Sequence, residues 1–144
     1  MLTKDEIQDL IKIATEFRQK SFLVRSKHKI GASVLTTGGE YYGGCLIESV
    51  ITGLGVCAER SAIDHAVIHG NYQIKAICVV DTKQIYPCGA CLQYLMQFFQ
   101  ITNKDIDILI SDIYGSHKIT SLKSLLPHGY ITKKNLVSLK KYQG

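Results

Sequence analysis

Apolar residues recur with helical spacing at the start of the chain. Between Ile7 and Phe17 they lie three or four positions apart, which is the spacing of one face of an α-helix. Thr3 followed by Glu6 fits a capping box, in which each residue satisfies the backbone N–H of the other. The pattern therefore predicts a helix from about Thr3 to Lys20 whose apolar face packs on the core.

After this helix, short apolar runs alternate with turn residues and with further helical patterns. The predicted strands are Ile30–Thr36, Tyr41–Leu46, Ile74–Val80 and Ile106–Ile110, and the predicted helices are Cys57–His69 and Gly89–Phe99. A hairpin turn is expected at 37–40, a loop at 48–55, a short strand pair at 114–119 and a helical turn at 122–126. This order favours a layered α/β domain with a mixed sheet.

Length and composition narrow the class of protein. The 144 residues are 46% hydrophobic and 20% charged, as expected for one globular domain spanning 1–144. No apolar run approaches the roughly 18 residues that span a bilayer, and the N-terminus lacks the order of a secretion signal. Five cysteines in such a chain favour free thiols in a reducing compartment, so we expect a cytoplasmic protein without a membrane partner.

The net charge of +5 has a simple interpretation. Much of the excess lies at Lys133, Lys134, Lys140 and Lys141, and no basic stripe is interleaved with stacking aromatic residues. We therefore expect a solvated basic tail at about 131–144 and no nucleic-acid partner.

Three cysteines stand at the entrances of two predicted helices. Cys57 opens one helix, and Cys88 and Cys91 open the next. The positive end of a helix dipole favours the thiolate form that binds metals, and the two-residue gap lets both sulfurs of the pair approach one zinc ion at about 2.3 Å. Three protein ligands leave a fourth tetrahedral position for water, which is typical of a catalytic zinc site.

Glu59 and Arg60, which follow Cys57-Ala58, also fit a catalytic zinc site. Zinc lowers the pKa of a bound water toward about 7, and a nearby carboxylate then takes and passes on the proton. Glu59 is the candidate for that role. Three thiolates outweigh the charge of the ion, and Arg60 can donate to a sulfur and offset the excess.

Other interpretations of the cysteines remain open. A redox Cys-x-x-Cys pair would leave Cys57 and Glu59 unexplained. A closed structural zinc site would need a histidine as its fourth ligand, for which the candidates are His28, His65, His69, His117 and His128. Cys45 and Cys78 lie in apolar strands and are expected to be packing residues.

The complete pattern resembles a known family. Cys57-Ala58-Glu59-Arg60 followed by Pro87-Cys88-Gly89-Ala90-Cys91 is similar to the small, homotetrameric cytidine deaminases, and the likeness extends from the first helix to about Tyr130. The resemblance implies a three-layer α/β/α fold with a mixed sheet of roughly five strands, a bound Zn²⁺, a cytosine nucleoside as small-molecule substrate and a homo-oligomer, most simply a tetramer.

The resemblance also implies substrate contacts. Glu48 would help to hold the ribose, the main-chain carbonyl of Ala58 would accept from the leaving amine, and Tyr130 would stack on a base in a neighbouring subunit. Tyr130 could equally be an ordinary interface residue.

The sequence departs from the family on the sugar side. Leu46 stands where the family usually has an asparagine, and His28-Lys29 stands where it has Phe-Pro. A lost hydrogen bond to a sugar hydroxyl costs about 1–3 kcal/mol. His28 is either a replacement sugar contact or an exposed histidine at the end of a strand.

The leading hypothesis is therefore zinc-dependent hydrolytic deamination of cytidine or deoxycytidine. The first alternative is a modified cytosine nucleoside such as blasticidin S, because the sugar-side changes and the segment Leu125–Tyr130 are also similar to blasticidin S deaminase. A base deaminase acting within nucleic acid and a non-catalytic zinc module remain further alternatives.

Overall fold

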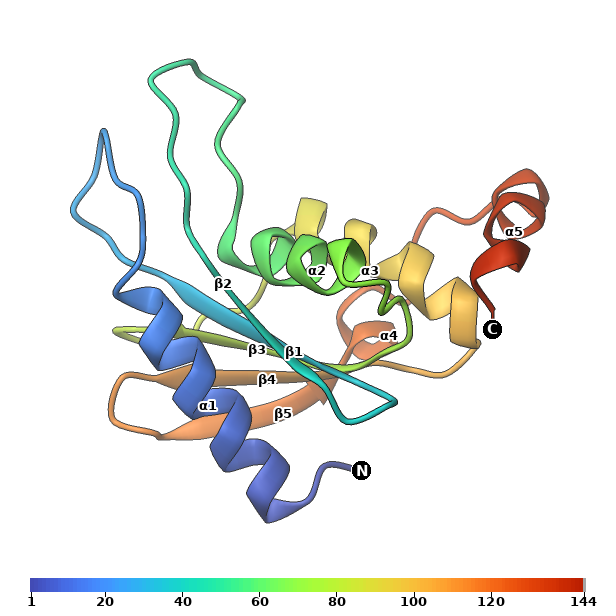
Figure 1. Cartoon of the computed structure of the whole chain (residues 1–144), viewed down its shortest axis with the longest axis horizontal. Helices are drawn as coiled ribbons and strands as arrows, with labels where there is room; N and C mark the ends of the chain where they lie inside the picture. Colours follow the sequence, from blue (N-terminus) through green and yellow to red (C-terminus); the bar gives the residue numbers. More distant parts are fainter. Residues whose placement is uncertain (144) are drawn as a thin grey trace.

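Five strands form one mixed sheet with helices on both faces in the computed structural model, which describes residues 1–143 (Figure 1). The strands are β1 (Gly31–Thr36), β2 (Tyr41–Cys45), β3 (Ile74–Asp81), β4 (Asp107–Asp112) and β5 (His117–Ser121). The helices are α1 (Lys4–Arg18), α2 (Ala58–Ile68), α3 (Gly89–Thr102), α4 (Leu122–Leu125) and α5 (Lys133–Leu139), followed by a 3₁₀ turn at Lys140–Tyr142.

The strand order is β2-β1-β3-β4-β5. Only β3 and β4 run parallel, joined by the crossover through α3, and the other neighbours are antiparallel. The mixed five-stranded sheet predicted from the sequence is thus confirmed. The strand pair expected at 114–119 is different: β5 pairs with β4 across a turn that contains Gly115 at φ 89°.

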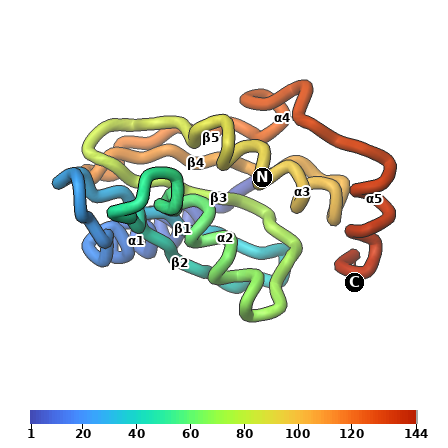
Figure 2. Tube along the Cα trace, turned by 90° about the horizontal axis from the view of Figure 1, so that it is seen from above, coloured from blue at the N-terminus to red at the C-terminus, as the bar shows by residue number. Residues whose placement is uncertain are grey.

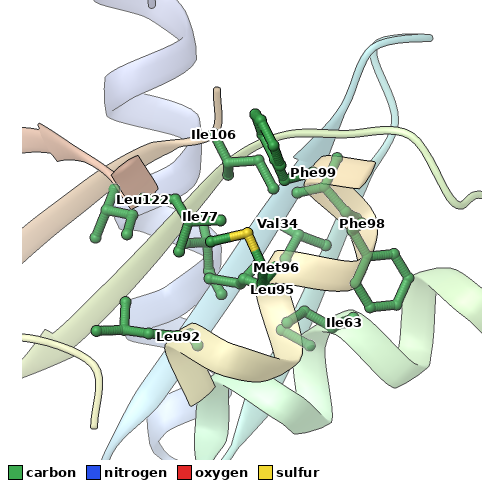
Figure 3. Packing of buried hydrophobic residues seen from close by; sticks show 14 of the residues in the cluster. Val34, Ile63, Ile77, Leu92, Leu95, Met96, Phe98, Phe99, Ile106 and Leu122 are labelled. Carbon is green, nitrogen blue, oxygen red and sulfur yellow. The ribbon is translucent and has the colours of Figure 1, made fainter. Parts of the chain in front are cut away.

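Each face of the sheet has its own apolar cluster. α1 covers one face, where Leu10 and Ala14 pack with Leu35. α2 and α3 cover the other face, and Figure 3 shows Leu95 and Met96 of α3 lying among the side chains of the sheet. Because β1 lies between these layers, all six of its residues are buried. The expected three layers, helix, sheet and helices, are therefore present.

The first helix begins as the sequence predicts. The N–H of Glu6 donates to Oγ1 of Thr3 at 3.1 Å, and the N–H of Thr3 donates to Oε2 of Glu6 at 2.9 Å, which completes the capping box. The helix spans 15 residues. No helix within residues 1–143 has the length and apolar character needed to cross a bilayer.

The C-terminal segment, which was expected to be a solvated basic tail, contains a short helix. This helix, α5, lies beside α3 (Figure 2). Leu139 and Tyr142 are partly buried against the core, and the ring of Tyr142 lies 4.8 Å from that of Tyr72. The lysines are exposed, and Leu139 and Tyr142 are the residues through which the segment packs on the core. Gly144, the last residue of the predicted tail, lies outside the described residues.

Candidate metal centre

Three thiols meet where α2 and α3 begin. Cys57 is the N-cap of α2, Cys88 is the N-cap of α3, and Cys91 lies in the first turn of α3. Their sulfur atoms all lie within 4.8 Å of one another, and those of Cys88 and Cys91 are 3.5 Å apart. Sulfurs bound to one tetrahedral zinc ion at about 2.3 Å are separated by about 3.8 Å. The thiols therefore fit a single zinc ion without rearrangement of the backbone.

The local backbone explains this placement. Cys57 and Cys88 both adopt the extended conformation of an N-cap, with ψ values of 152° and 164°. Neither side chain makes a capping hydrogen bond, so each sulfur stays available beside the free N–H groups of a helix start. Those groups and the helix dipole favour a thiolate. The N-cap positions of the two helices thus provide two of the sulfurs, and the first turn of α3 provides the third.

The thiols influence each other's ionisation. The pKa of Cys57 falls to about 5 because the Cys91 thiol donates to its sulfur and Arg60 lies beside it. The pKa of Cys91 is raised by that same hydrogen bond and by burial. Cysteines bind a metal as thiolates, so binding of a divalent ion releases their protons. In this cluster Cys57 already favours the thiolate form, so fewer protons have to be released.

Arg60 is placed to balance the charge of the thiolates. Its Nη2 lies 3.9 Å from the sulfur of Cys57, which raises the pKa of the guanidinium. Its Nε is buried and has no acceptor among the residues that the structure describes. The guanidinium of Arg60 can therefore offset part of the negative charge that the three thiolates would carry around a bound metal.

Glu59 is a buried acid beside the thiols. Only 5% of the residue is exposed, and burial raises the pKa of its carboxyl while the neighbouring Cys91 thiol acts in the opposite direction. The residue follows Cys57 by two positions in the first turn of α2. Glu59 therefore has the position needed to exchange a proton with a molecule bound at the metal.

Glu48 holds a neighbouring loop. Its Oε1 accepts from the N–H groups of Val24, Arg25 and Ser26 at 2.9, 3.0 and 3.1 Å, and its Oε2 accepts from the Ser26 hydroxyl at 2.9 Å. These hydrogen bonds lower the pKa of Glu48 to about 2. The sequence singled out Glu48 as a sugar contact but gave no sign that the loop at 22–30 depends on it.

His28 of the same loop is bound to the sheet. Its Nε2 lies 2.6 Å from Oδ2 of Asp81, a residue that is only 2% exposed at the end of β3. The side chain of His28 itself is 51% exposed. Sequence reasoning missed Asp81, although an acidic residue directly after the apolar run of β3 was the available signal. Whether His28 also contacts a sugar stays a prediction.

The other three predicted substrate contacts, Leu46, Ala58 and Tyr130, differ in their exposure and in their neighbours. Leu46 lines the same cavity as Cys57. Ala58 is buried, and its carbonyl oxygen would lie 2.7 Å from a Cβ at Gly44. Tyr130 is 69% exposed, and its backbone exchanges two hydrogen bonds of 2.9 Å with the side chain of Gln93. The roles of these residues toward a substrate stay predictions.

Two cavities lie beside other parts of the fold or at the edge of the thiol cluster. One of about 370 Å³ lies between the β1–β2 turn and Tyr142, and one of about 520 Å³ lies along α3 beside Arg60 and Tyr130. None of the three clustered thiols lines either cavity. The second cavity borders the metal centre through Arg60, which donates to Cys57.

Several known proteins are similar to this chain in sequence or in fold. The family model of the cytidine and deoxycytidylate deaminase zinc-binding region matches residues 4–104. A cytidine deaminase of Sporosarcina psychrophila is 33% identical over 133 residues, which cover 91% of this chain and 95% of the relative. Blasticidin-S deaminase of Bacillus cereus is 28% identical over 132 residues, covering 85% and 90%. The crystal structure of cytidine deaminase from Burkholderia pseudomallei matches with a TM-score of 0.79 at 32% identity, covering 90% of this chain and 100% of that one.

Proposed function

Because the chain belongs to the cytidine and deoxycytidylate deaminase family, we propose that it hydrolyses cytidine or deoxycytidine to the uracil nucleoside and ammonia. It is a zinc-dependent hydrolase of the deaminase type. The observation that carries the proposal is the cluster of three thiols within 4.8 Å of one another with the buried carboxyl of Glu59 beside it.

Cys57, Cys88 and Cys91 would hold the zinc ion. When bound, zinc supplies a Lewis acid with one coordination position left for water, which becomes a nucleophile at neutral pH. Arg60 donates to the sulfur of Cys57 and reduces the negative charge that three thiolates place on the site.

Glu59 moves the protons of the reaction. Its carboxylate takes a proton from the attacking water and delivers it to N3 of the cytosine ring, which makes C4 open to attack. The same carboxyl group then transfers the remaining proton of the added hydroxyl to the amino nitrogen, so that ammonia leaves and the C4 carbonyl forms. Burial of Glu59 keeps bulk water away from these transfers.

The residues around the thiols would also contact the substrate. The carbonyl of Ala58 accepts from the amine that leaves, and Glu48 and His28 belong to the loops on the sugar side. Leu46 gives that side an apolar surface where an amide would bind a hydroxyl. We therefore expect weaker recognition of an unmodified ribose than of the cytosine ring.

We further propose a homo-oligomer, most simply a tetramer, that works in pyrimidine salvage in the cytoplasm. Val50, Ile51 and Leu54 of the loop that follows β2 are 76%, 59% and 63% exposed, and apolar side chains gathered on one loop favour a protein partner. In such an assembly Tyr130 would reach the site of a neighbouring subunit. Thiols used as metal ligands favour a reducing compartment.

Blasticidin S is the second candidate substrate. The likeness to a blasticidin-S deaminase over 85% of the chain supports it, and so does Leu46, which removes one expected contact to a ribose hydroxyl. The reaction at C4 would be the same, and only the sugar-side recognition would differ.

An ammonia-release assay tests the proposal. Zinc-loaded enzyme is compared on cytidine, deoxycytidine, free cytosine and blasticidin S, with Glu59→Gln as the inactive variant and Glu16→Gln on the exposed face of α1 as the charge-matched control. We expect release from at least one nucleoside, a fall of about 10²–10⁴-fold in Glu59→Gln with zinc retained, and no change in Glu16→Gln. Full activity of Glu59→Gln would refute the proton-transfer role.

A further inference from the structure

Two histidines lie one helical turn apart at the C-terminal end of α2. His65 is in the last turn of the helix, and His69 is the C-cap that follows it. Residues four positions apart project from the same face of a helix, and two histidines at this spacing can bind one zinc ion together. Neither residue belongs to the cluster of metal-binding side chains that the three cysteines form.

Each of the two rings has one nitrogen held by a backbone carbonyl. Nδ1 of His65 lies 2.9 Å from the carbonyl oxygen of Gly43 in β2, and Nδ1 of His69 lies 2.8 Å from that of His65. Because a carbonyl oxygen only accepts hydrogen bonds, both Nδ1 atoms carry a proton, and in a neutral imidazole the lone pair is then on Nε2. A metal-binding histidine almost always donates its other ring N–H in this way.

The two rings are neighbours on the surface of the helix. Their centroids lie 5.0 Å apart, and the ring of Tyr42 lies 5.2 Å from each of them. Nitrogen atoms bound to one tetrahedral zinc ion at about 2.0–2.1 Å are separated by about 3.3 Å. His65 is half-buried and His69 is exposed, so a small rotation of the His69 ring adjusts the pair to that separation.

We propose that His65 and His69 form a second metal site, which binds a divalent ion of the zinc, nickel or copper class through the two Nε2 atoms. Imidazole nitrogens suit these metals. Within residues 1–143, neither histidine belongs to a cluster of three or more potential ligand side chains, so water completes the coordination. Two neutral ligands hold an ion less tightly than three thiolates do. The second ion therefore leaves when the protein is desalted, whereas zinc at the cysteines stays.

A bound ion would stabilise the end of α2. It would join two successive turns of the helix, and His65 also links the helix to β2 through the carbonyl of Gly43. An ion that binds only the folded chain raises Tm as its concentration increases. The site requires no step of the deamination reaction and is separate from the function proposed above.

Equilibrium dialysis of the desalted, zinc-loaded enzyme against increasing concentrations of Zn²⁺ tests the proposal. The wild type should bind a second equivalent of zinc per chain. His65→Asn and His69→Asn should each weaken this second binding by about tenfold or more, because loss of a ligand costs at least as much as loss of the group that orients it. Asparagine keeps an N–H donor near the place of Nδ1 and has no atom at the place of Nε2.

His117 provides the matched control. Its Nδ1 also lies 2.9 Å from a backbone carbonyl oxygen, that of Gly115, but the residue belongs to the exposed strand β5 and has no histidine one helical turn away. His117→Asn should leave the second equivalent unchanged. Retention of the untagged, zinc-loaded protein on immobilised Ni²⁺ should follow the same order, with the wild type and His117→Asn held more strongly than the two α2 variants.

Two results overturn the inference. One is a wild type that binds a single zinc ion per chain, and the other is a second ion bound with unchanged affinity by the α2 variants. Should His65→Asn fail to fold because its contact with β2 is lost, His69→Asn on the exposed side still decides the question. The deaminase function is judged by ammonia release and the second site by metal binding, so either proposal can fail while the other stands.

Discussion

Gly44 provides a sharp test of how the sheet positions the metal site. This residue of β2 lies directly against the backbone of α2, so that an alanine Cβ at position 44 would lie 2.2 Å from the nitrogen of Ala62 and 2.7 Å from the oxygen of Ala58. Ordinary contacts begin at 3.4 Å. Because both neighbours are backbone atoms of a buried helix, α2 would have to move away from β2 by about 1 Å.

The structure gives a magnitude for Gly44→Ala. Overpacking of this kind costs about 1–3 kcal/mol, and the reduced entropy of the unfolded chain returns about 0.4–1 kcal/mol. For a chain of this size each kcal/mol shifts Tm by about 3–4 °C. We therefore expect Tm to fall by up to about 10 °C. The start of α2 carries Cys57 as its N-cap and Glu59 in its first turn, so zinc retention and kcat/KM should fall as well.

Thermal unfolding followed by circular dichroism at a fixed zinc concentration measures the effect. Gly38→Ala is the matched control, because a Cβ there meets only the flexible side chain of Glu40, and its Tm should stay within about 2 °C of the wild type. If Gly44→Ala also stayed within that range and kept its full zinc content, the close packing of α2 on β2 would be wrong.

Four further substitutions test the surroundings of the site. Arg60→Gln removes the donor to Cys57 and should weaken zinc binding by about ten- to a hundredfold in a chelator competition; an unchanged affinity would contradict its role. The lowered pKa of Glu48, about 2 against the usual 4.5, stabilises the fold above pH 4.5, and this stabilisation is lost as the pH falls toward 2. Urea unfolding should therefore show a larger loss of stability for Glu48→Gln at pH 7 than at pH 3, and equal losses would refute the argument. Asp81→Asn replaces the carboxylate that binds Nε2 of His28 with an amide, and should lower the free energy of unfolding by about 1–3 kcal/mol. If the two residues act only through each other, adding His28→Ala to this variant should lower the free energy of unfolding little further.

Local signals in the sequence predicted each half of the candidate metal centre. Cys88 and Cys91 lie within one helical turn, and Glu59 follows Cys57 by two positions, so the proximity within each half requires only that a helix begins there. The meeting of Cys57 with the Cys88–Cys91 pair is a contact between two helices, and the resemblance to a known family, not the local pattern, implied it. The capping box of α1 is equally local. The alternation of apolar runs then predicted the mixed sheet, because a buried strand between two helical layers needs apolar residues on both faces.

Contacts between distant parts of the chain could not be predicted in this way. His28 and Asp81 are 53 positions apart, and nothing in either neighbourhood indicates the other. Glu48 binds backbone N–H groups, which carry no sequence signature. The short helix α5 was interpreted as a tail because its charge pattern is that of a surface, whereas Leu139 and Tyr142 pack on the core only once α3 is in place.

The coordination of the metal tests the central claim most directly. X-ray absorption at the zinc edge, combined with the metal content of freshly purified protein, should show one zinc ion per chain with three sulfur ligands at about 2.3 Å and one lighter oxygen ligand. Protein without stoichiometric metal, or zinc whose fourth ligand is an imidazole or another thiolate, would contradict a catalytic site built on Cys57, Cys88 and Cys91.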